Sequence, residues 1–132
     1  MILVDSNILL DILTLDSQWY DWSAAKLCML AESHDLIIND IIYTEISIGF
    51  ERIEDLEETF SGGFFKIVQM PKEALFLAGK AFLRYKSNNG TKNPVLPDLF
   101  IGAHASVLGI PLITRDTSRY KTYFPKLLLI TP

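Results

Sequence analysis

The sequence predicts an α/β fold in which a central parallel sheet of about five short strands is covered by helices on both faces. Short apolar runs that resemble strands alternate with longer segments of helical character. These runs are continuously apolar instead of alternating between apolar and polar residues, which is typical of strands buried on both faces. We expect a single domain over residues 1–132, because no internal repeat or low-complexity segment interrupts this order.

The chain is expected to begin with a strand and two helices. MILV forms a short buried strand that ends at Asp5, and SNILLDIL adds a helical turn or two. After a break, a longer helix is expected over about residues 18–33, with Ser17 as its cap. LII at residues 36–38 is then expected to form the second strand.

A long helical stretch follows the second strand. Asn39 or Asp40 is expected to cap a helix in IIYTEISIGF. ERIEDLEETF continues it as an acidic amphipathic helix, which Gly62 and Gly63 end. FFKIVQM then provides the third strand.

The remaining elements are marked by prolines and a glycine. Pro71 is suited to the first turn of a helix in KEALFLAGKAFLRYK, and SNNGTKNP at residues 87–94 is expected to be a loop. Pro97 opens a helix in DLFIGAHASVL that Gly109 closes. PLIT and KLLLIT are expected to form the fourth and fifth strands.

Composition indicates a protein of the cell interior. The chain is 49% hydrophobic, which is enough for a substantial core, yet no apolar run approaches the roughly 18 residues that cross a bilayer. MILVDSN lacks a basic region and a small-residue cleavage site, so secretion is not expected. Cys28 is the only cysteine and forms no internal disulfide. We therefore expect a cytoplasmic protein without a membrane partner.

Four acidic residues lie at the ends of apolar runs or on the apolar side of a helix: Asp5, Glu45, Asp98 and Asp116. A carboxylate in such a place is costly to desolvate unless a positive group meets it. No lysine or arginine is patterned to pair locally with the first three, and only Asp116 has a neighbour of this kind, Arg115. A divalent cation would neutralise all four.

The predicted topology allows these carboxylates to meet. Ligands of open parallel sheets bind beyond the carboxyl ends of the strands, where Asp5 and Asp116 follow strands and where the helices of Glu45 and Asp98 can reach. Oxygen ligands suit Mg²⁺ or Mn²⁺. Zinc is disfavoured, because Cys28, His34 and His104 have no ligand spacing.

Three of the four carboxylates also have an ordinary explanation when each is taken singly. Asp5 could cap a helix, Asp98 could favour a helix dipole, and Asp116 could cap TSRYKTYF, but Glu45 lies in mid-helix, where capping explains nothing. Three further acids, Asp11, Asp16 and Asp21, are interpreted as surface or cap residues. His104 is interpreted as a hydrogen-bonded residue of the core or rim, and the aromatic residues Trp19, Tyr20 and Trp22 either pack in the core or line a partner groove.

The chain resembles the PIN-domain nucleases, especially the VapC-type toxins of toxin–antitoxin pairs. The matching segments are VDSN at residues 4–7, TEI at 44–46, PDLFIGAHA at 97–105 and ITRD at 113–116. The resemblance implies that Asp5, Glu45, Asp98 and Asp116 hold Mg²⁺ or Mn²⁺ and position the attacking water, with Asn7 and Thr114 as supporting polar residues. One departure is that the third segment carries Phe100, Gly102 and His104, where smaller residues or more ordinary helix formers are usual.

The same resemblance implies a metal-dependent endoribonuclease that acts as a toxin and forms a homodimer. A cognate antitoxin would lay an amphipathic segment along an apolar groove of the protein. A net charge of −4 argues against a nucleic-acid partner at first, but basic residues are clustered. The candidate RNA contacts are Lys80, Arg84, Lys86, Lys92 and Arg115, although such groups are also common on a solvated face.

Two other functions are compatible with a chain of this size. A phospho-receiver module has a similar size and sheet, but it requires a pair of acids after the first strand, an aspartate after the third and a lysine after the fifth. In this chain Ser6 and Asn7 follow Asp5, FFKIVQMP has no aspartate, and LLLITP has no lysine. A catalytically inactive PIN scaffold that only binds RNA or protein stays open as the alternative.

Overall fold

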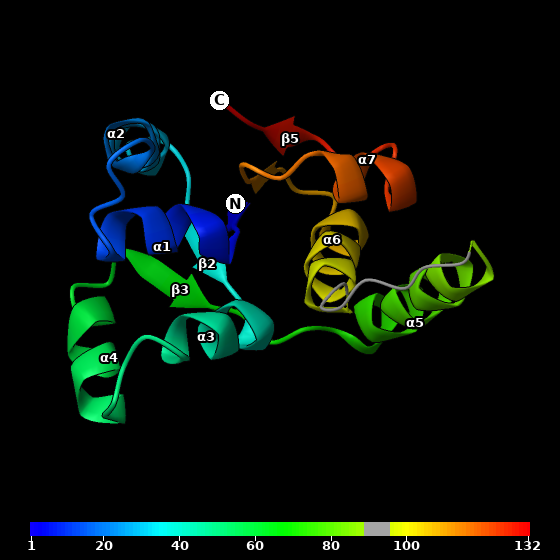
Figure 1. Cartoon of the computed structure of the whole chain (residues 1–132), viewed down its shortest axis with the longest axis horizontal. Coiled ribbons are helices and arrows are strands. Elements are labelled where there is room, and N and C mark those ends of the chain that lie inside the picture. Colours follow the sequence, from blue (N-terminus) through cyan, green and yellow to red (C-terminus); the bar gives the residue numbers. More distant parts are fainter. Residues whose placement is uncertain (89–95) are drawn as a thin grey trace.

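The computed structural model describes residues 1–88 and 96–132, in which seven helices surround a five-stranded parallel sheet (Figure 1). The strands are β1 (Ile2–Val4), β2 (Leu36–Ile38), β3 (Phe65–Ile67), β4 (Leu112–Ile113) and β5 (Leu129–Ile130). Their order across the sheet is β3-β2-β1-β4-β5, and every neighbouring pair is parallel. The predicted fold class is therefore confirmed.

The helices are α1 (Ser6–Leu13), α2 (Tyr20–Ala31), α3 (Asp40–Ser47), α4 (Ile53–Phe60), α5 (Lys72–Ser87), α6 (Leu96–Leu108) and α7 (Ser118–Tyr123). In Figure 1, α1 to α4 occupy the left half and α5 to α7 the right half. Connections between parallel strands are right-handed. The connections from β1 to β2 and β3 therefore place their helices on one face of the sheet, and the connections that return to β4 and β5 place theirs on the other face.

The strand order reverses direction beside β1. The chain moves from β1 outward to β2 and β3, and then returns to add β4 on the other side of β1. Leu3 pairs with both Ile37 and Leu112, and all three side chains are completely buried. A reversal of this kind leaves a crevice at the carboxyl ends of the two central strands. Asp5 directly follows β1 at this crevice, and Thr114 directly follows β4.

Two local predictions were wrong. Ser17 does not cap α2; the Asp16 carboxylate accepts hydrogen bonds from the backbone N–H groups of Gln18 and Trp19, and α2 begins only at Tyr20. The helical stretch after β2 is also not continuous. It ends after Ser47 and resumes at Ile53, because the backbone turns tightly between these residues.

Other boundaries within the described residues follow the expected signals, whereas the loop expected at residues 87–94 lies mostly outside them. Asn39 is the cap of α3, since its Oδ1 accepts a 2.9 Å hydrogen bond from the backbone N–H of Ile42. Pro97 lies in the first turn of α6, and Gly109 follows that helix with a φ of +67°, a conformation that favours glycine. Within residues 1–88 and 96–132, no helix is both long enough and apolar enough to span a bilayer.

Candidate active site at the carboxyl edge of the sheet

Asp5 is the most buried of the four predicted carboxylates, with an exposed fraction of 3%. It is the N-cap of α1, and its Oδ1 accepts a 2.7 Å hydrogen bond from the backbone N–H of Ser6. The simple capping role therefore exists, but it uses only one carboxylate oxygen. The other oxygen has a separate set of partners.

Oδ2 of Asp5 collects donors from distant parts of the chain. The hydroxyls of Thr114 and Tyr120 each donate to it over 2.8 Å, and the amide of Asn7 lies 3.5 Å away. The same amide also donates to Oγ1 of Thr114 over 3.1 Å. Burial raises the pKa of Asp5, and the hydrogen bonds from Thr114, Tyr120 and Ser6 oppose that rise. The structure thus places the two predicted supporting residues, Asn7 and Thr114, directly beside Asp5.

Glu45 reaches the same place from α3. Its Oε1 accepts a 2.9 Å hydrogen bond from the hydroxyl of Ser6, the residue that follows Asp5. Burial raises the pKa of Glu45, and the negative charges of Asp5 and Asp98 raise it further, while the Ser6 hydrogen bond opposes them. Glu45 therefore lies within the electrostatic field of two other carboxylates.

Asp98 lies in the first turn of α6 and is paired with Arg119 of α7. Burial, followed by the negative charge of Asp5, raises the pKa of Asp98 to about 6 even though Arg119 opposes the change. The charge of Asp116 adds to the rise. The partner of Asp98 is not local in sequence, because it comes from α7, a helix whose position the sequence pattern does not reveal.

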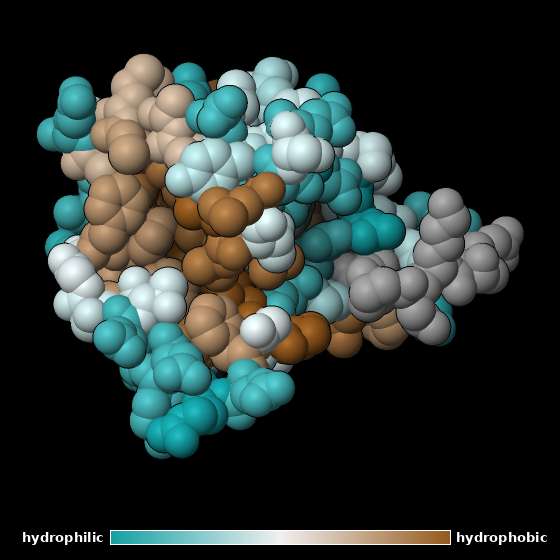
Figure 2. All heavy atoms as spheres, turned by 60° about the vertical axis from the view of Figure 1, so that its left-hand side comes forward, coloured by the Kyte–Doolittle hydropathy of each residue, from teal (hydrophilic) through white to brown (hydrophobic). Residues whose placement is uncertain are grey.

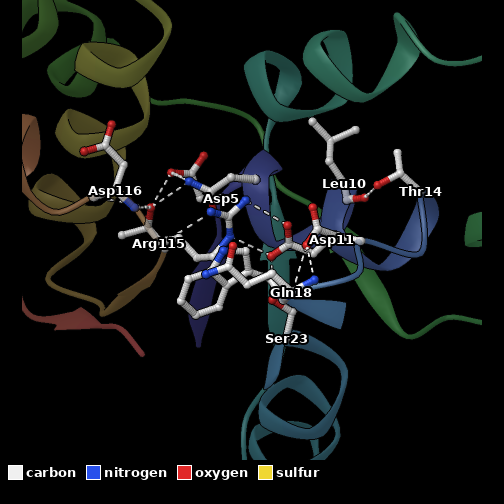
Figure 3. A network of polar contacts seen from close by, with 12 residues as sticks. Asp5, Leu10, Asp11, Thr14, Gln18, Ser23, Arg115 and Asp116 are labelled. Carbon is white, nitrogen blue, oxygen red and sulfur yellow. Dashed lines mark hydrogen bonds and ion pairs between the residues drawn. The ribbon is translucent and has the colours of Figure 1, made fainter. Parts of the chain in front are cut away.

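Asp116 lies at the rim of this group. Its side chain is exposed, and in Figure 3 its carboxylate stands apart from Asp5 at the outer end of the network. Its backbone N–H donates to Oγ1 of Thr114 over 3.1 Å, which fixes the turn after β4. The structure thus brings Asp5, Glu45 and Asp98 into mutual electrostatic reach and leaves Asp116 beside them.

Arg115 does not pair with Asp116, although the two are adjacent. Its Nε and Nη2 each donate over 2.8 Å to the two oxygens of Asp11, which also accepts a 2.7 Å hydrogen bond from Ser23 (Figure 3). The guanidinium stacks on the ring of Trp19, with 5.2 Å between its Cζ and the ring centroid. Asp11 is only 2% exposed, so its assignment to the surface or to a cap was wrong.

The pair of Asp11 and Arg115 anchors the turn that follows β4. The backbone N–H of Arg115 donates to Oδ1 of Asn7 over 3.2 Å, so the turn is tied to α1 at two points. A buried ion pair with two parallel hydrogen bonds holds its geometry firmly. This contact therefore helps to position Thr114 and Asp116.

Three residues of this region were not predicted from the sequence: Ser6, Arg119 and Tyr120. The last two depend on how closely α7 packs against α6. Gly102 lies at that contact, where an added Cβ would collide with the ring of Phe124 and come within 3.1 Å of Tyr120. The unusual glycine of α6 therefore allows the approach that brings the Tyr120 hydroxyl to Asp5.

His104 is buried in α6, as expected for a residue of the core. Its Nδ1 lies 3.0 Å from the amide nitrogen of Asn39, which caps the helix that carries Glu45. Because that amide donates, Nδ1 accepts and the neutral ring keeps its proton on Nε2. Burial lowers the pKa of His104 and so favours this neutral form. The contact joins α3 to α6, the helices of Glu45 and Asp98.

The candidate RNA-binding residues of α5 are exposed beside aromatic rings. Nζ of Lys80 lies 5.0 Å from the ring centroid of Phe76, and Nζ of Lys86 lies 5.5 Å from that of Phe82. Arg84 stacks on Tyr123 with 5.2 Å between its Cζ and the ring centroid. The third lysine of the prediction, Lys92, lies outside the described residues.

The donor set of the site suits a hard divalent cation, because all of the candidate ligands are oxygens. As the side chains stand, no three His, Cys, Asp or Glu residues of the described chain are close enough to hold one ion together. Ser6 engages Glu45, and Arg119 engages Asp98. Mg²⁺ commonly binds through one or two carboxylates and keeps several waters. The residues therefore fit a hydrated ion better than a closed cage.

Comparisons with known proteins agree with this architecture. A family model described as PIN domain matches residues 2–125. No curated protein matches the chain. Among solved structures, a VapBC2 complex from Rickettsia felis, bound to a DNA fragment from its promoter, is 21% identical with a TM-score of 0.76, over 100% of this chain and 99% of that chain.

Two further solved structures are similar over their whole length. FitAcB from Neisseria gonorrhoeae is 21% identical with a TM-score of 0.73, over 100% of this chain and 98% of that one. A toxin–antitoxin complex from Klebsiella pneumoniae is 23% identical with a TM-score of 0.69, over the same shares of the two chains, 100% and 98%. At these identities the likeness establishes the fold.

Proposed function

The chain belongs to the PIN-domain family, and from that premise we propose that it is an endoribonuclease that hydrolyses RNA phosphodiesters with Mg²⁺ or Mn²⁺. PIN domains are a family of nucleases that typically use divalent metals. One observation carries the proposal for this chain. Asp5, Glu45 and Asp98 come from three separate segments at the carboxyl edge of the sheet, and the negative charge of Asp5 raises the pKa values of both Glu45 and Asp98.

In this proposal the metal is held by Asp5, Glu45, Asp98 and Asp116, directly or through water. A bound divalent cation supplies an activated water and stabilises the leaving oxygen of a phosphodiester. The surrounding residues hold the carboxylates in place: Thr114, Tyr120 and Asn7 orient Asp5, and Ser6 orients Glu45. Lys80, Arg84 and Lys86 are proposed to contact the RNA backbone, which fixes its position without reading its sequence.

The experiment that tests this function is RNA cleavage by the purified chain with Mg²⁺ or Mn²⁺, compared with EDTA. Asp5→Asn removes one candidate ligand, and Asp21→Asn is a matched control on an exposed part of α2. We expect cleavage that requires the metal, disappears in Asp5→Asn and persists in Asp21→Asn. Cleavage that survives EDTA or the Asp5 substitution would reject the proposed site.

We further propose that the nuclease is a toxin that a cognate antitoxin neutralises. The support is an apolar groove of about 370 Å³ between α1, α2 and the segment from α4 to β3. Apolar side chains gather on the corresponding face in Figure 2. The groove is lined by Leu9, Ile12, Leu13, Tyr20, Ala24, Leu27, Cys28, Thr59, Phe60, Phe64 and Phe65. This surface suits the apolar face of an amphipathic helix.

Two of the three aromatic residues at the start of α2 follow the interpretations that the sequence left open, and the third follows neither. Tyr20 lines the groove, whereas Trp22 packs against the core and Trp19 stacks on Arg115.

Expression of the chain in a bacterial host tests the toxin proposal. We expect growth arrest by the wild type and normal growth with Asp5→Asn, and equal growth with both would count against a toxin.

A homodimer is also proposed, and exposed apolar side chains on α5 support it. Phe76 is 69% exposed and Leu83 is 62% exposed, and Leu75 lies on the same helix. Clusters of this kind on a protein surface commonly mark an interface. We expect light scattering to show a dimer for the wild type and a larger share of monomer for Phe76→Asp. A monomeric wild type would refute the homodimer proposal.

A second candidate function is an inactive scaffold that binds RNA or protein. The pairing of Asp98 with Arg119 favours it, because a carboxylate that is already neutralised has less need of a metal. The cleavage experiment separates the two functions. A chain that binds RNA but never cuts it in Mg²⁺ or Mn²⁺ would be the scaffold.

A further inference from the structure

Two arginines near the site are held in different ways. Arg115 makes two parallel hydrogen bonds to the buried Asp11 and stacks on Trp19. Arg119 contacts Asp98 through Nη1, and about a quarter of its side chain is exposed. Arg115 is therefore fixed by its partners, whereas the anionic partner of Arg119 among residues 1–88 and 96–132 is itself a candidate metal ligand.

Arg119 lies inside the acidic group, where it would compete with a divalent cation for the Asp98 carboxylate. Its positive charge meets Asp98, which also faces the negative charges of Asp5 and Asp116. A divalent cation at Asp98 would repel the guanidinium and replace its role as a counter-charge. The side chain of Asp98 is about a fifth exposed, whereas that of Asp11 is only 2% exposed, so a hydrated cation can approach Asp98 but not Asp11. Arg119 and a divalent cation are thus alternative partners of the same carboxylate.

We propose that Arg119 is an internal counter-ion of Asp98 that a divalent cation displaces, and that the freed guanidinium then binds a phosphate of the RNA. This inference rests on the proposed nuclease function. The guanidinium is planar and presents paired donors that match the oxygens of a phosphate. Its helix also carries Tyr120, whose hydroxyl donates to Asp5, so α7 is already positioned against the candidate metal ligands.

The first test measures Mn²⁺ affinity directly by calorimetry in the absence of RNA. Arg119→Gln removes the competing charge, and Lys121→Gln makes the same charge change on the exposed side of α7. We expect Arg119→Gln to bind Mn²⁺ between about twofold and tenfold more tightly than the wild type, and Lys121→Gln to match the wild type. Equal or weaker binding by Arg119→Gln would overturn the counter-ion role.

The second test measures RNA cleavage by the same proteins at saturating Mn²⁺. Arg119→Gln is expected to cut more slowly, or with a higher KM, although it binds the metal more tightly. Arg119→Lys keeps the charge but lacks the planar fork, so we expect Mn²⁺ affinity near that of the wild type and weakened cleavage. Faster cleavage by Arg119→Gln would overturn the phosphate-binding role.

These results also separate the inference from the function on which it rests. Absence of Mn²⁺ binding in both the wild type and Arg119→Gln would refute the metal-dependent nuclease and the inference together. Unchanged Mn²⁺ affinity and normal cleavage in Arg119→Gln would refute the inference alone. Thermal unfolding in EDTA verifies that each variant is folded before either comparison is made.

Discussion

The hydroxyl of Tyr120 donates a 2.8 Å hydrogen bond to Oδ2 of Asp5, and this contact joins α7 to the beginning of α1. Both side chains are buried, so the bond forms away from competing water. Asp5 and Glu45 share a further link through Ser6, which contacts both carboxylates. The acidic site is therefore held by donors that surround it on several sides.

Tyr120→Phe tests the first of these contacts. The substitution removes the hydroxyl and keeps the ring, so it should lower the free energy of unfolding by about 2 kcal/mol, as expected for a buried hydrogen bond to a charged group. Urea denaturation in EDTA measures the change. Tyr123→Phe, which keeps the ring that stacks on Arg84, serves as the control on the same helix. An equal loss in both variants would count against a special role for the bond.

The pair of Asp11 and Arg115 should stabilise the fold more than an exposed pair does. Arg115→Gln leaves the buried Asp11 carboxylate without its counter-charge, and we expect a loss of about 3 kcal/mol. Asp11→Asn in the same chain should restore part of it, which a double-mutant cycle in urea quantifies.

Arg52→Gln is the matched control for this cycle. Arg52 pairs with Glu54 on the surface, where both side chains are about two-thirds exposed. Its substitution should change the free energy of unfolding by less than about 1 kcal/mol. Similar losses at Arg52 and Arg115 would contradict the interpretation of Arg115 as an anchor of the turn after β4.

Gly102→Ala is expected to destabilise the protein by about 1–2 kcal/mol. The added methyl group would improve helix propensity, but it would collide with Phe124 and push α7 away from α6. Gly79→Ala on α5 is the control, because nothing lies within 4 Å of the added Cβ. That variant should gain up to about 1 kcal/mol in the same urea experiment. Stabilisation by both alanines would argue against the close packing.

The metal-free protein should respond to pH through Asp98. Its folded pKa of about 6 lies above the ordinary aspartate pKa of 3.8, so the folded state retains the proton to higher pH than the unfolded chain does. Ionisation of Asp98 therefore costs stability, and the cost develops as pH rises from about 4 to above 6. The stabilising contribution of protonated Asp98 is fully present at low pH and is lost as the pH rises through about 6.

Asp98→Asn removes this titration. In EDTA we expect the variant to have a higher melting temperature than the wild type at pH 7.5 and a smaller advantage, or none, at pH 5. Thermal unfolding monitored by circular dichroism at both pH values measures the difference. An advantage that is larger at pH 5 would show that the raised pKa is not present in the folded protein.

The sequence was sufficient to predict the sheet and the central part of the site. Continuous apolar runs predicted the parallel strands, and the carboxyl ends of such strands lie at one edge, where Asp5 and the segment after β4 meet. The resemblance to PIN domains pointed to Asn7 and Thr114, which lie beside Asp5 in the structure. Glu45 was found because an acid in mid-helix has no capping explanation.

The parts that were not predicted depend on packing between distant helices. Arg119 and Tyr120 reach the site because Gly102 allows α7 to approach α6, and no periodic pattern encodes that distance. Asp11 was placed on the surface because its partner, Arg115, lies more than a hundred residues away in the chain. The break between α3 and α4 was missed because apolar and acidic residues continue a helical pattern across it.

The central claim is that the acidic group of Asp5, Glu45 and Asp98 binds a divalent cation, and Mn²⁺ calorimetry on the wild type, Asp5→Asn and Asp21→Asn tests it most directly. We predict binding by the wild type and Asp21→Asn, with a loss of affinity of at least about tenfold in Asp5→Asn. A wild type that binds no Mn²⁺, or an Asp5→Asn variant that binds it equally well, would contradict the account.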